Sequence, residues 1–86
     1  MKNGLHIAPY GNKYWYLEGE LHREDGPAVE YPDGTKEWWL EGKLHREDGP
    51  AVEYPDGTKE WYLNYKNIKC HSQEEFEKLM KLKAFW

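Results

Sequence analysis

The stretch LHREDGPAVEYPDGTKEW decides the fold: it occupies residues 21–38 and recurs without a single change at residues 44–61. The two copies are therefore 23 residues apart. The same register reaches upstream to residues 11–19 and downstream to residue 64, and it fades to a weak match at residues 3–6. Self-similarity at a fixed period is the signature of a repeat architecture. The chain is thus predicted to stack copies of one small supersecondary unit.

Each unit is predicted to be a β-hairpin. Residues 27–31 are rich in strand formers, the turn sequence Pro-Asp-Gly follows at 32–34, and residues 36–40 return as a second strand. Proline fixes φ at the turn, and glycine supplies the positive φ that a tight reversal requires. A three-residue turn closed by a glycine bulge places Glu30 opposite Lys36, so that opposite charges face each other across the hairpin.

Strand alternation divides each unit into two faces. One face is predicted to carry Ala28, Trp38 and Leu40, and the other Val29, Tyr31, Glu37 and Trp39. The first face is expected to hold the core, because stacked hairpins bury one another's apolar faces whereas a lone hairpin is marginal in water. Its predicted buried row consists of Trp15, Trp38 and Trp61, with Leu17, Leu40 and Leu63.

The C-terminal segment is predicted to close the stack as a helix. Residues 72–75 read Ser-Gln-Glu-Glu, a capping box with serine at the N-cap and glutamate three residues later. The helix is expected to dock on the last hairpin beside Tyr65 and Ile68, because an isolated helix of this length is unstable in water. The apolar stripe that follows at helical spacing consists of Phe76, Leu79, Met80, Leu82 and Phe85.

The predicted fold is therefore mainly β: an elongated antiparallel meander of stacked 23-residue β-hairpin repeats with one C-terminal capping α-helix. A chain of 86 residues suffices for one small domain with a thin core. That single domain spans residues 1–86 and divides into a partial first repeat at 1–19, repeats at 20–42 and 43–66, and a helix cap at 72–84.

Charge and cysteine content narrow the range of functions. The net charge is −4, and residues 1–63 hold 13 acidic against 7 basic side chains. An acidic body argues against direct binding to nucleic acid or to a membrane surface, because both favour cationic patches. Cys70 is the only cysteine, so no internal disulfide can form, and a reducing, cytoplasmic location is expected.

The period, the YPDG turns at 31–34 and 54–57, and the Gly-Lys-Leu-His step at 42–45 resemble the MORN repeat family. The run HREDGPA, at 22–28 and 45–51, is more similar to a divergent MORN-like class known mainly from phages, large DNA viruses and bacteria. The resemblance covers most of the chain. It implies an elongated antiparallel β-meander used for protein contacts.

The repeated His-Arg-Glu-Asp segments, at 22–25 and 45–48, carry the most reactive groups. One hypothesis is a metal or phosphate site with the two histidines stacked one unit apart. The other is structural: the aspartates satisfy backbone donors in the turn, and the arginines pair with neighbouring carboxylates. A metal would need further donors that the sequence does not supply. Glutamates one repeat apart sit in matching environments, so neither catalysis nor a cofactor is predicted.

The second face of the sheet is the predicted binding site. Its aromatic side chains would be exposed if the first face is the core, and exposed aromatic rows mark protein interfaces. The alternative is a thin core on both sides of the sheet. Acidic side chains around the rings favour a protein partner with a basic surface. The candidate partner-binding residues are Tyr16, Tyr31, Trp39, Tyr54, Tyr62, Glu30, Glu37, Glu53 and Glu60.

These observations predict a non-enzymatic protein-binding module. The family resemblance adds a sharper hypothesis, a small phage-encoded inhibitor of a host defence protein such as a CRISPR effector. The alternative function is a small-ligand or metal-ion binder that uses the repeated His-Arg-Glu-Asp loops. Open sheet edges would also allow a homodimer to form.

Overall fold

The computed structural model of the chain describes residues 2–82, and its fold is mainly β, as the sequence predicts. One helix, α1 (Gln73–Lys81), follows the last strand. The strands in chain order are β1 (Gly4–Ile7), β2 (Lys13–Leu17), β3 (Glu20–Leu21), β4 (Val29–Glu30), β5 (Lys36–Glu37), β6 (Trp39–Leu40), β7 (Lys43–Leu44), β8 (Val52–Glu53), β9 (Lys59–Leu63) and β10 (Lys66–Ile68).

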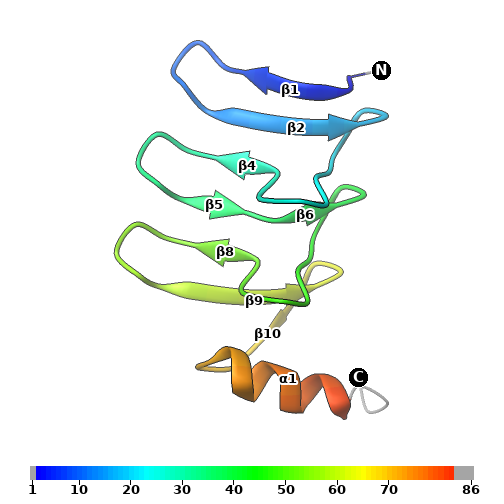
Figure 1. The fold of residues 1–86 in the computed structure, drawn as a ribbon, viewed down its shortest axis with the longest axis vertical. Coiled ribbons are helices and arrows are strands. Elements are labelled where there is room, and N and C mark those ends of the chain that lie inside the picture. The colour runs from blue at the N-terminus through cyan, green and yellow to red at the C-terminus, as the bar shows by residue number, and fades with distance from the viewer. Residues whose placement is uncertain (1, 83–86) are drawn as a thin grey trace.

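The strands form an antiparallel meander. The main sheet runs in the order β1-β2-β4-β5-β8-β9-β10, with β3 paired to β2 and β6 paired to β7. Figure 1 shows the hairpins stacked along one direction, with β1 at one end and α1 at the other. The molecule is a thin ribbon of 41 × 30 × 17 Å. None of the described helical residues forms a segment long and apolar enough to cross a membrane.

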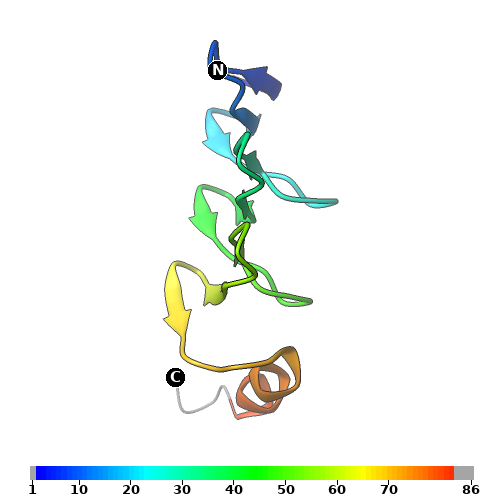
Figure 2. The same cartoon turned by 90° about the vertical axis from the view of Figure 1, so that its left-hand side faces the viewer.

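Between β3 and β4, and again between β7 and β8, the chain leaves the sheet in a protruding loop. We call these segments, residues 22–27 and 45–50, the HREDGP loops after their shared sequence. Figure 2 shows both loops projecting from the same face of the ribbon, with α1 on that face as well. The two faces of the sheet are therefore not equivalent.

The predicted hairpin register is confirmed. Glu30 lies opposite Lys36, and the Tyr31 N–H donates to the Thr35 carbonyl at 2.9 Å. The Gly34 N–H returns to the Tyr31 carbonyl at 3.0 Å, so the turn is closed on itself. The Asp33 carboxylate accepts from the Thr35 N–H at 2.8 Å, which holds the pKa of this side chain below its ordinary value. The turn at residues 54–58 repeats the same bonds.

The opposite end of each hairpin reverses in two residues that both have positive φ, as in a type I′ turn. Glycine occupies the second position of the first two turns, at Gly19 and Gly42. In the third turn Tyr65 takes this place with a φ of 72°, a conformation that a bulky residue adopts only at a cost. The last turn of the repeat array therefore lacks the glycine that the two earlier turns have at this position.

The assignment of side chains to the two faces is also confirmed, since Val29 lies opposite Glu37. We call the face with Trp15, Trp38 and Trp61 the arginine face, and the opposite face, with Tyr16, Trp39 and Tyr62, the tyrosine face. At the centre of the sheet both sides are buried: Ala28 and Ala51 are 0% exposed, and Val29 and Val52 are 1% and 3% exposed. The core is therefore thin and two-sided.

The predicted buried row holds only in part. Trp61 is 5% exposed, but Trp15 and Trp38 are half-buried and Leu17 is 48% exposed. The indoles lie two strands apart in the sheet, about 10 Å, which is too far for ring to pack on ring. Arg23 and Arg46 instead lie over the rings of Trp15 and Trp38, and Leu17 stays exposed.

The helix caps the stack as predicted. The Ser72 hydroxyl accepts from the Glu75 N–H at 3.1 Å, and Phe76 is 0% exposed in a cluster with Trp61 and Ile68. The role predicted for Tyr65 is wrong, because this side chain is 54% exposed and lies away from that cluster. Positions 83–84 of the predicted helix, and Phe85 of its stripe, lie outside the described residues.

Candidate interaction surfaces

The HREDGP loops cover the indoles of the arginine face. The Arg23 guanidinium lies over the Trp15 ring, 4.0 Å from its centroid, and the Arg46 guanidinium lies 3.9 Å from the centroid of Trp38. A cation over an indole face is attracted by the ring quadrupole, more strongly when partly desolvated. Each loop therefore folds back to close the space above one tryptophan.

Hydrogen bonds hold each arginine in that position. Arg46 donates from Nε to Asp48 at 2.9 Å, and from Nη1 to the Pro50 carbonyl and to Glu53, both at 3.1 Å. A Cβ on Gly49 would lie 2.5 Å from the Arg46 Cζ, so only glycine leaves room for the guanidinium.

The first loop repeats this arrangement around Arg23. The Arg23 Nε donates to Asp25 at 2.9 Å, and this bond with its positive charge holds the pKa of Asp25 below the ordinary value. A Cβ on Gly26 would lie 2.9 Å from the Arg23 Cζ. The predicted pairing of the arginines with carboxylates is confirmed, although the aspartates accept from arginine side chains rather than from the turn.

The two histidines of the loops serve the neighbouring hairpin. Nδ1 of His22 accepts from the Glu41 N–H at 2.9 Å, and Nδ1 of His45 accepts from the Asn64 N–H at 3.0 Å. Both donors are first residues of the two-residue turns, so each histidine fastens the next turn along the ribbon. Nε2 of His45 then lies 3.3 Å from the Glu47 carboxylate.

The first turn shows that this task needs no imidazole. The Glu18 N–H donates to the side-chain oxygen of Asn3 at 2.8 Å, in the place that histidine takes later. An amide oxygen that replaces histidine points to hydrogen bonding rather than metal ligation. Among the described residues no group of three or more His, Cys, Asp or Glu side chains is arranged to hold a metal ion. These contacts favour the structural interpretation of the HREDGP loops.

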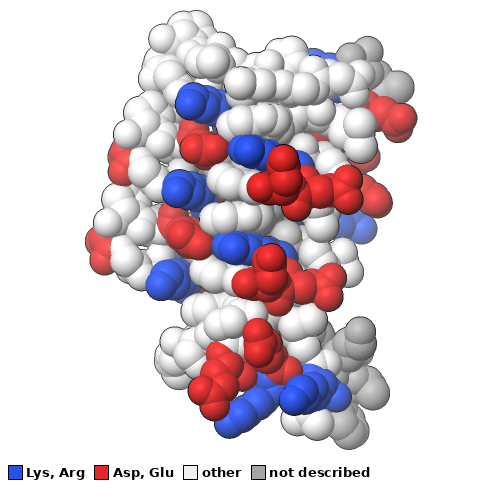
Figure 3. Space-filling model, viewed as in Figure 1, with Lys and Arg blue, Asp and Glu red and all other residues white. Residues whose placement is uncertain are grey.

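A ladder of alternating charge crosses the arginine face. Lys13, Glu30, Lys36, Glu53 and Lys59 are successive cross-strand partners. Figure 3 shows the resulting alternation of basic and acidic groups down the sheet. The expectation that Glu30 and Glu53 flank the aromatic row is wrong, because a side-chain period of two places them on the opposite face from Glu37 and Glu60. Both carboxylates are paired with the arginines of the loops.

The remaining predicted residues lie together on the tyrosine face. Glu37 accepts from the Trp39 indole N–H at 2.9 Å, and Glu60 accepts from the Tyr54 hydroxyl at 2.9 Å. The bond to Glu60 raises the pKa of Tyr54 to about 12. For Tyr31, burial first and the charge of Glu37 second raise the phenol pKa.

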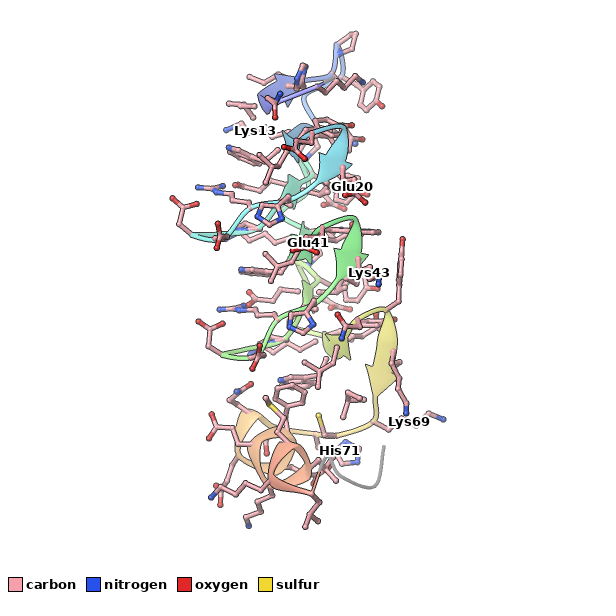
Figure 4. The ribbon with its side chains drawn as sticks, turned by 90° about the vertical axis from the view of Figure 1, so that its right-hand side faces the viewer. Lys13, Glu20, Glu41, Lys43, Lys69 and His71 are labelled. Atoms are coloured by element: carbon pink, nitrogen blue, oxygen red, sulfur yellow. The ribbon has the colours of Figure 1, made fainter. Side chains whose placement is uncertain are left out.

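The three aromatic side chains that recur along this face, Tyr16, Trp39 and Tyr62, are each half-buried. These rings are therefore neither fully buried in a second core nor fully exposed as a binding row. Their exposure lies between the two alternatives that the sequence left open. Figure 4 shows the short strands that carry Glu20 and Lys43 on the side of the ribbon away from the HREDGP loops. Those strands border the tyrosine face.

Tyr65 is a functional candidate that sequence reasoning missed. Its ring packs edge-on against Trp39, with centroids 5.4 Å apart, while remaining 54% exposed. A strained, exposed aromatic residue in a turn that uses glycine elsewhere is a reason to suspect function. The signal was visible in the sequence, because position 65 breaks a glycine that the two earlier turns share.

The stacking of arginine on tryptophan was missed as well. In both copies the arginine follows its tryptophan by eight residues and the glycine follows the arginine by three, from Trp15 to Arg23 to Gly26 and from Trp38 to Arg46 to Gly49. This constant spacing was the available signal.

A groove of about 420 Å³ separates the two HREDGP loops. Arg23, Trp38 and Arg46 contribute to its lining. The loop tips beside it are exposed and acidic, with side-chain exposures of 85%, 87%, 65% and 87% for Glu24, Asp25, Glu47 and Asp48. Figure 3 shows these tips as two red clusters, one repeat apart.

Cys70 is a half-buried thiol that packs against the helix cluster. Burial first, and the nearby Glu75 carboxylate second, raise the pKa of this thiol above its ordinary value. A nucleophilic cysteine needs the opposite shift, because the thiolate is the reactive form. The arrangement therefore favours a structural cysteine over a catalytic one.

Comparison of the chain with protein-family models, with curated proteins and with solved structures gives no match. The geometry by itself defines the class of protein: a hairpin-repeat ribbon with one arginine-covered and one aromatic face. The resemblance to MORN-like repeats rests only on the sequence motifs quoted for it.

Proposed function

We propose that the chain is a protein-binding module with no catalytic activity, and that its tyrosine face contacts the partner. One observation carries the proposal: the loop arginines and α1 pack on the indoles of the arginine face, whereas neither the HREDGP loops nor α1 lies over the half-buried aromatic row of the other face (Figure 2). Aromatic side chains at the centre of a patch supply most of the energy of protein interfaces.

The charges around this row suit a partner with a basic surface. Glu37 and Glu60 lie among the rings, and the chain carries a net charge of −4. Electrostatic complementarity of this kind speeds association and selects partners. In its sharper form, which rests on the MORN-like resemblance, the proposal is a phage-encoded inhibitor of a nucleic-acid-binding host defence protein such as a CRISPR effector. The free thiol of Cys70 supports a cytoplasmic location.

The test is capture from bacterial lysate with matched variants on the two faces. Trp39→Ala removes an aromatic side chain from the tyrosine face, and the control Glu24→Gln/Glu47→Gln removes two exposed charges from the loop tips. We expect a protein that the wild type and the control retain and that Trp39→Ala loses. If the loop-tip control instead lost the partner and Trp39→Ala kept it, the interface would lie at the HREDGP loops on the arginine face, and the proposal would be wrong.

The electrostatic part has its own test. Binding of the captured protein should weaken as salt rises, because surface charges more than about 8 Å apart are largely screened at physiological ionic strength. Unchanged affinity between low and high salt would remove the basic-surface requirement and leave the aromatic contact in place.

The groove between the HREDGP loops supports a second candidate function, the binding of a small ligand or metal ion. Its volume of about 420 Å³ lies within the range of small-molecule sites. Calorimetry with zinc, calcium and nucleotides, on the wild type and on His22→Ala/His45→Ala, separates the two candidates. Heat of binding that the double variant abolishes would favour the groove over the tyrosine face.

A further inference from the structure

The two ends of the sheet are closed differently. At one end α1 packs against the last hairpin, whereas at the other β1 is the terminal strand, and its neighbour in the described sheet is β2 alone. All four residues of β1 are exposed. An open edge strand presents unpaired backbone groups that template pairing with another chain.

The backbone groups that β1 directs outward can be assigned. The Ala8 N–H donates to the Asn12 carbonyl at 2.8 Å, so the backbone of Ala8 faces β2. Backbone direction alternates along an antiparallel strand, so Gly4 and His6 also face β2, whereas Leu5 and Ile7 direct their N–H and C=O groups to the open side. The pairing of Trp15, which lies opposite Leu5, agrees with this, because the Trp15 N–H donates away from β1, to the carbonyl of Ala28 just before β4.

The side chains of this edge lack the usual protection against pairing. Natural edge strands carry charged residues, lysine above all. The other terminal strand, β10, has Lys66, with Lys69 one residue beyond its end, whereas β1 reads Gly-Leu-His-Ile. Leu5 is 47% and Ile7 61% exposed, and both lie on the arginine face opposite Trp15 and Lys13.

We propose that two copies of the chain pair antiparallel through β1, with His6 of each opposite His6 of the other. In this register Leu5 of each copy faces Ile7 of the other, which matches the two exposed apolar side chains and forms four backbone hydrogen bonds. This register is chosen because it places both Leu5–Ile7 pairs directly opposite each other on the arginine face. Cross-strand partners share a face, so the tyrosine faces of the two copies lie on the same side of one continuous sheet.

The pairing is measured without any partner protein, so its failure leaves the proposed function standing. Sedimentation of the 86-residue chain should show a species of twice 10.3 kDa that grows with concentration between about 10 μM and about 1 mM, where small interfaces dissociate. A single 10.3 kDa species over this whole range overturns the proposal.

Two matched lysine variants locate the edge. Ile7→Lys puts a charge on the proposed contact at a site already 61% exposed, and Asn67→Lys puts one on the opposite edge, β10. We expect Ile7→Lys to remain monomeric with an unchanged circular dichroism spectrum and Asn67→Lys to associate like the wild type. Association that survives Ile7→Lys and fails in Asn67→Lys would assign the contact to β10 and overturn the proposal.

A cysteine pair tests the register. In a Cys70→Ser background, His6→Cys should form a disulfide-linked dimer under mild oxidation, because directly opposite non-hydrogen-bonded residues are within disulfide reach. Ile7→Cys, the matched control, lies opposite Leu5 and should give little crosslinking. Efficient crosslinking at position 7 and none at position 6 would contradict the register.

Discussion

Residues 21–38 and 44–61 have the same sequence but different contacts. In the inner copy the Trp38 ring is covered by Arg46, whereas in the outer copy Trp61 packs against Phe76 of α1, with ring centroids 6.4 Å apart. The carboxylate one residue before each tryptophan also changes partner: Glu37 accepts from an indole N–H, and Glu60 accepts from a tyrosine hydroxyl.

The difference shows which contacts are determined within one repeat and which are determined by the neighbouring element. Hairpin register and turn hydrogen bonds are the same in both copies, because they depend on residues within eighteen positions. The cover of the tryptophan is supplied by the next element along the ribbon, a loop in one case and a helix in the other. Tyr62, at the position of Trp39, has no indole N–H, so the bond made by Glu37 has no equivalent at Glu60.

The largest expected effect comes from removing the helical cover. Phe76→Ala empties a site that is 0% exposed, and large-to-small changes of this kind cost about 3–5 kcal/mol. Chemical denaturation should therefore show a fall in the free energy of unfolding of about 3 kcal/mol or more. Phe76→Leu, which keeps most of the apolar volume, should lose less than half as much. Equal losses in the two variants would mean that volume does not explain the role of Phe76.

Removing the arginine cover should cost less. Arg46→Ala loses the contact with Trp38 and leaves Glu53 without its partner, for a loss of about 2 kcal/mol in unfolding free energy. Arg46→Lys retains the charge and loses the planar fork, so we expect a loss of about 1 kcal/mol. Full stability in the lysine variant would show that charge alone matters and that stacking on the ring contributes nothing.

The hairpin repeat, its register and the capping helix could be predicted from the sequence, because turn residues and period-two alternation act locally. The thin core buried on both sides was one of two alternatives that the sequence left open, since burial of Val29 and Val52 depends on how neighbouring units stack. In the candidate site, Trp39 and Tyr62 were placed on the correct face. Glu30 was not, although the predicted register already pairs it with Lys36 on the other face, because the acidic side chains were grouped with the rings by charge alone.

The two-residue turns extend the comparison to the backbone. Tyr65→Gly relieves a positive φ that costs a bulky residue about 1 kcal/mol, so the variant should be more stable by up to that amount. Gly42→Tyr imposes the same strain on the inner turn and brings a Cβ within 2.8 Å of the Glu20 carboxylate, so it should be less stable. A stabilised Tyr65→Gly that binds the captured partner more weakly would identify Tyr65 as a residue retained for binding.

If Tyr65→Gly were instead less stable than the wild type, the contact with Trp39 would outweigh the backbone strain. Tyr65 would then be part of the fold, and its role at the interface would lose its support. Thermal unfolding of the two turn variants decides between these outcomes.

The smallest effect is a difference in titration between the two copies. The Tyr54 phenol donates to Glu60, which raises its pKa to about 12, whereas in Tyr31 burial is the main cause of the increase. A pKa raised by folding adds stability that is fully present below the ordinary value near 10 and is lost as pH rises toward 12.

Glu60→Gln should therefore lower the titration midpoint of Tyr54 in ultraviolet absorbance, measured as the difference from a Tyr54→Phe chain. Glu37→Gln should move Tyr31 less. Equal shifts would mean that the two identical copies respond to charge alike, and that the different bonds of Glu37 and Glu60 have no electrostatic consequence.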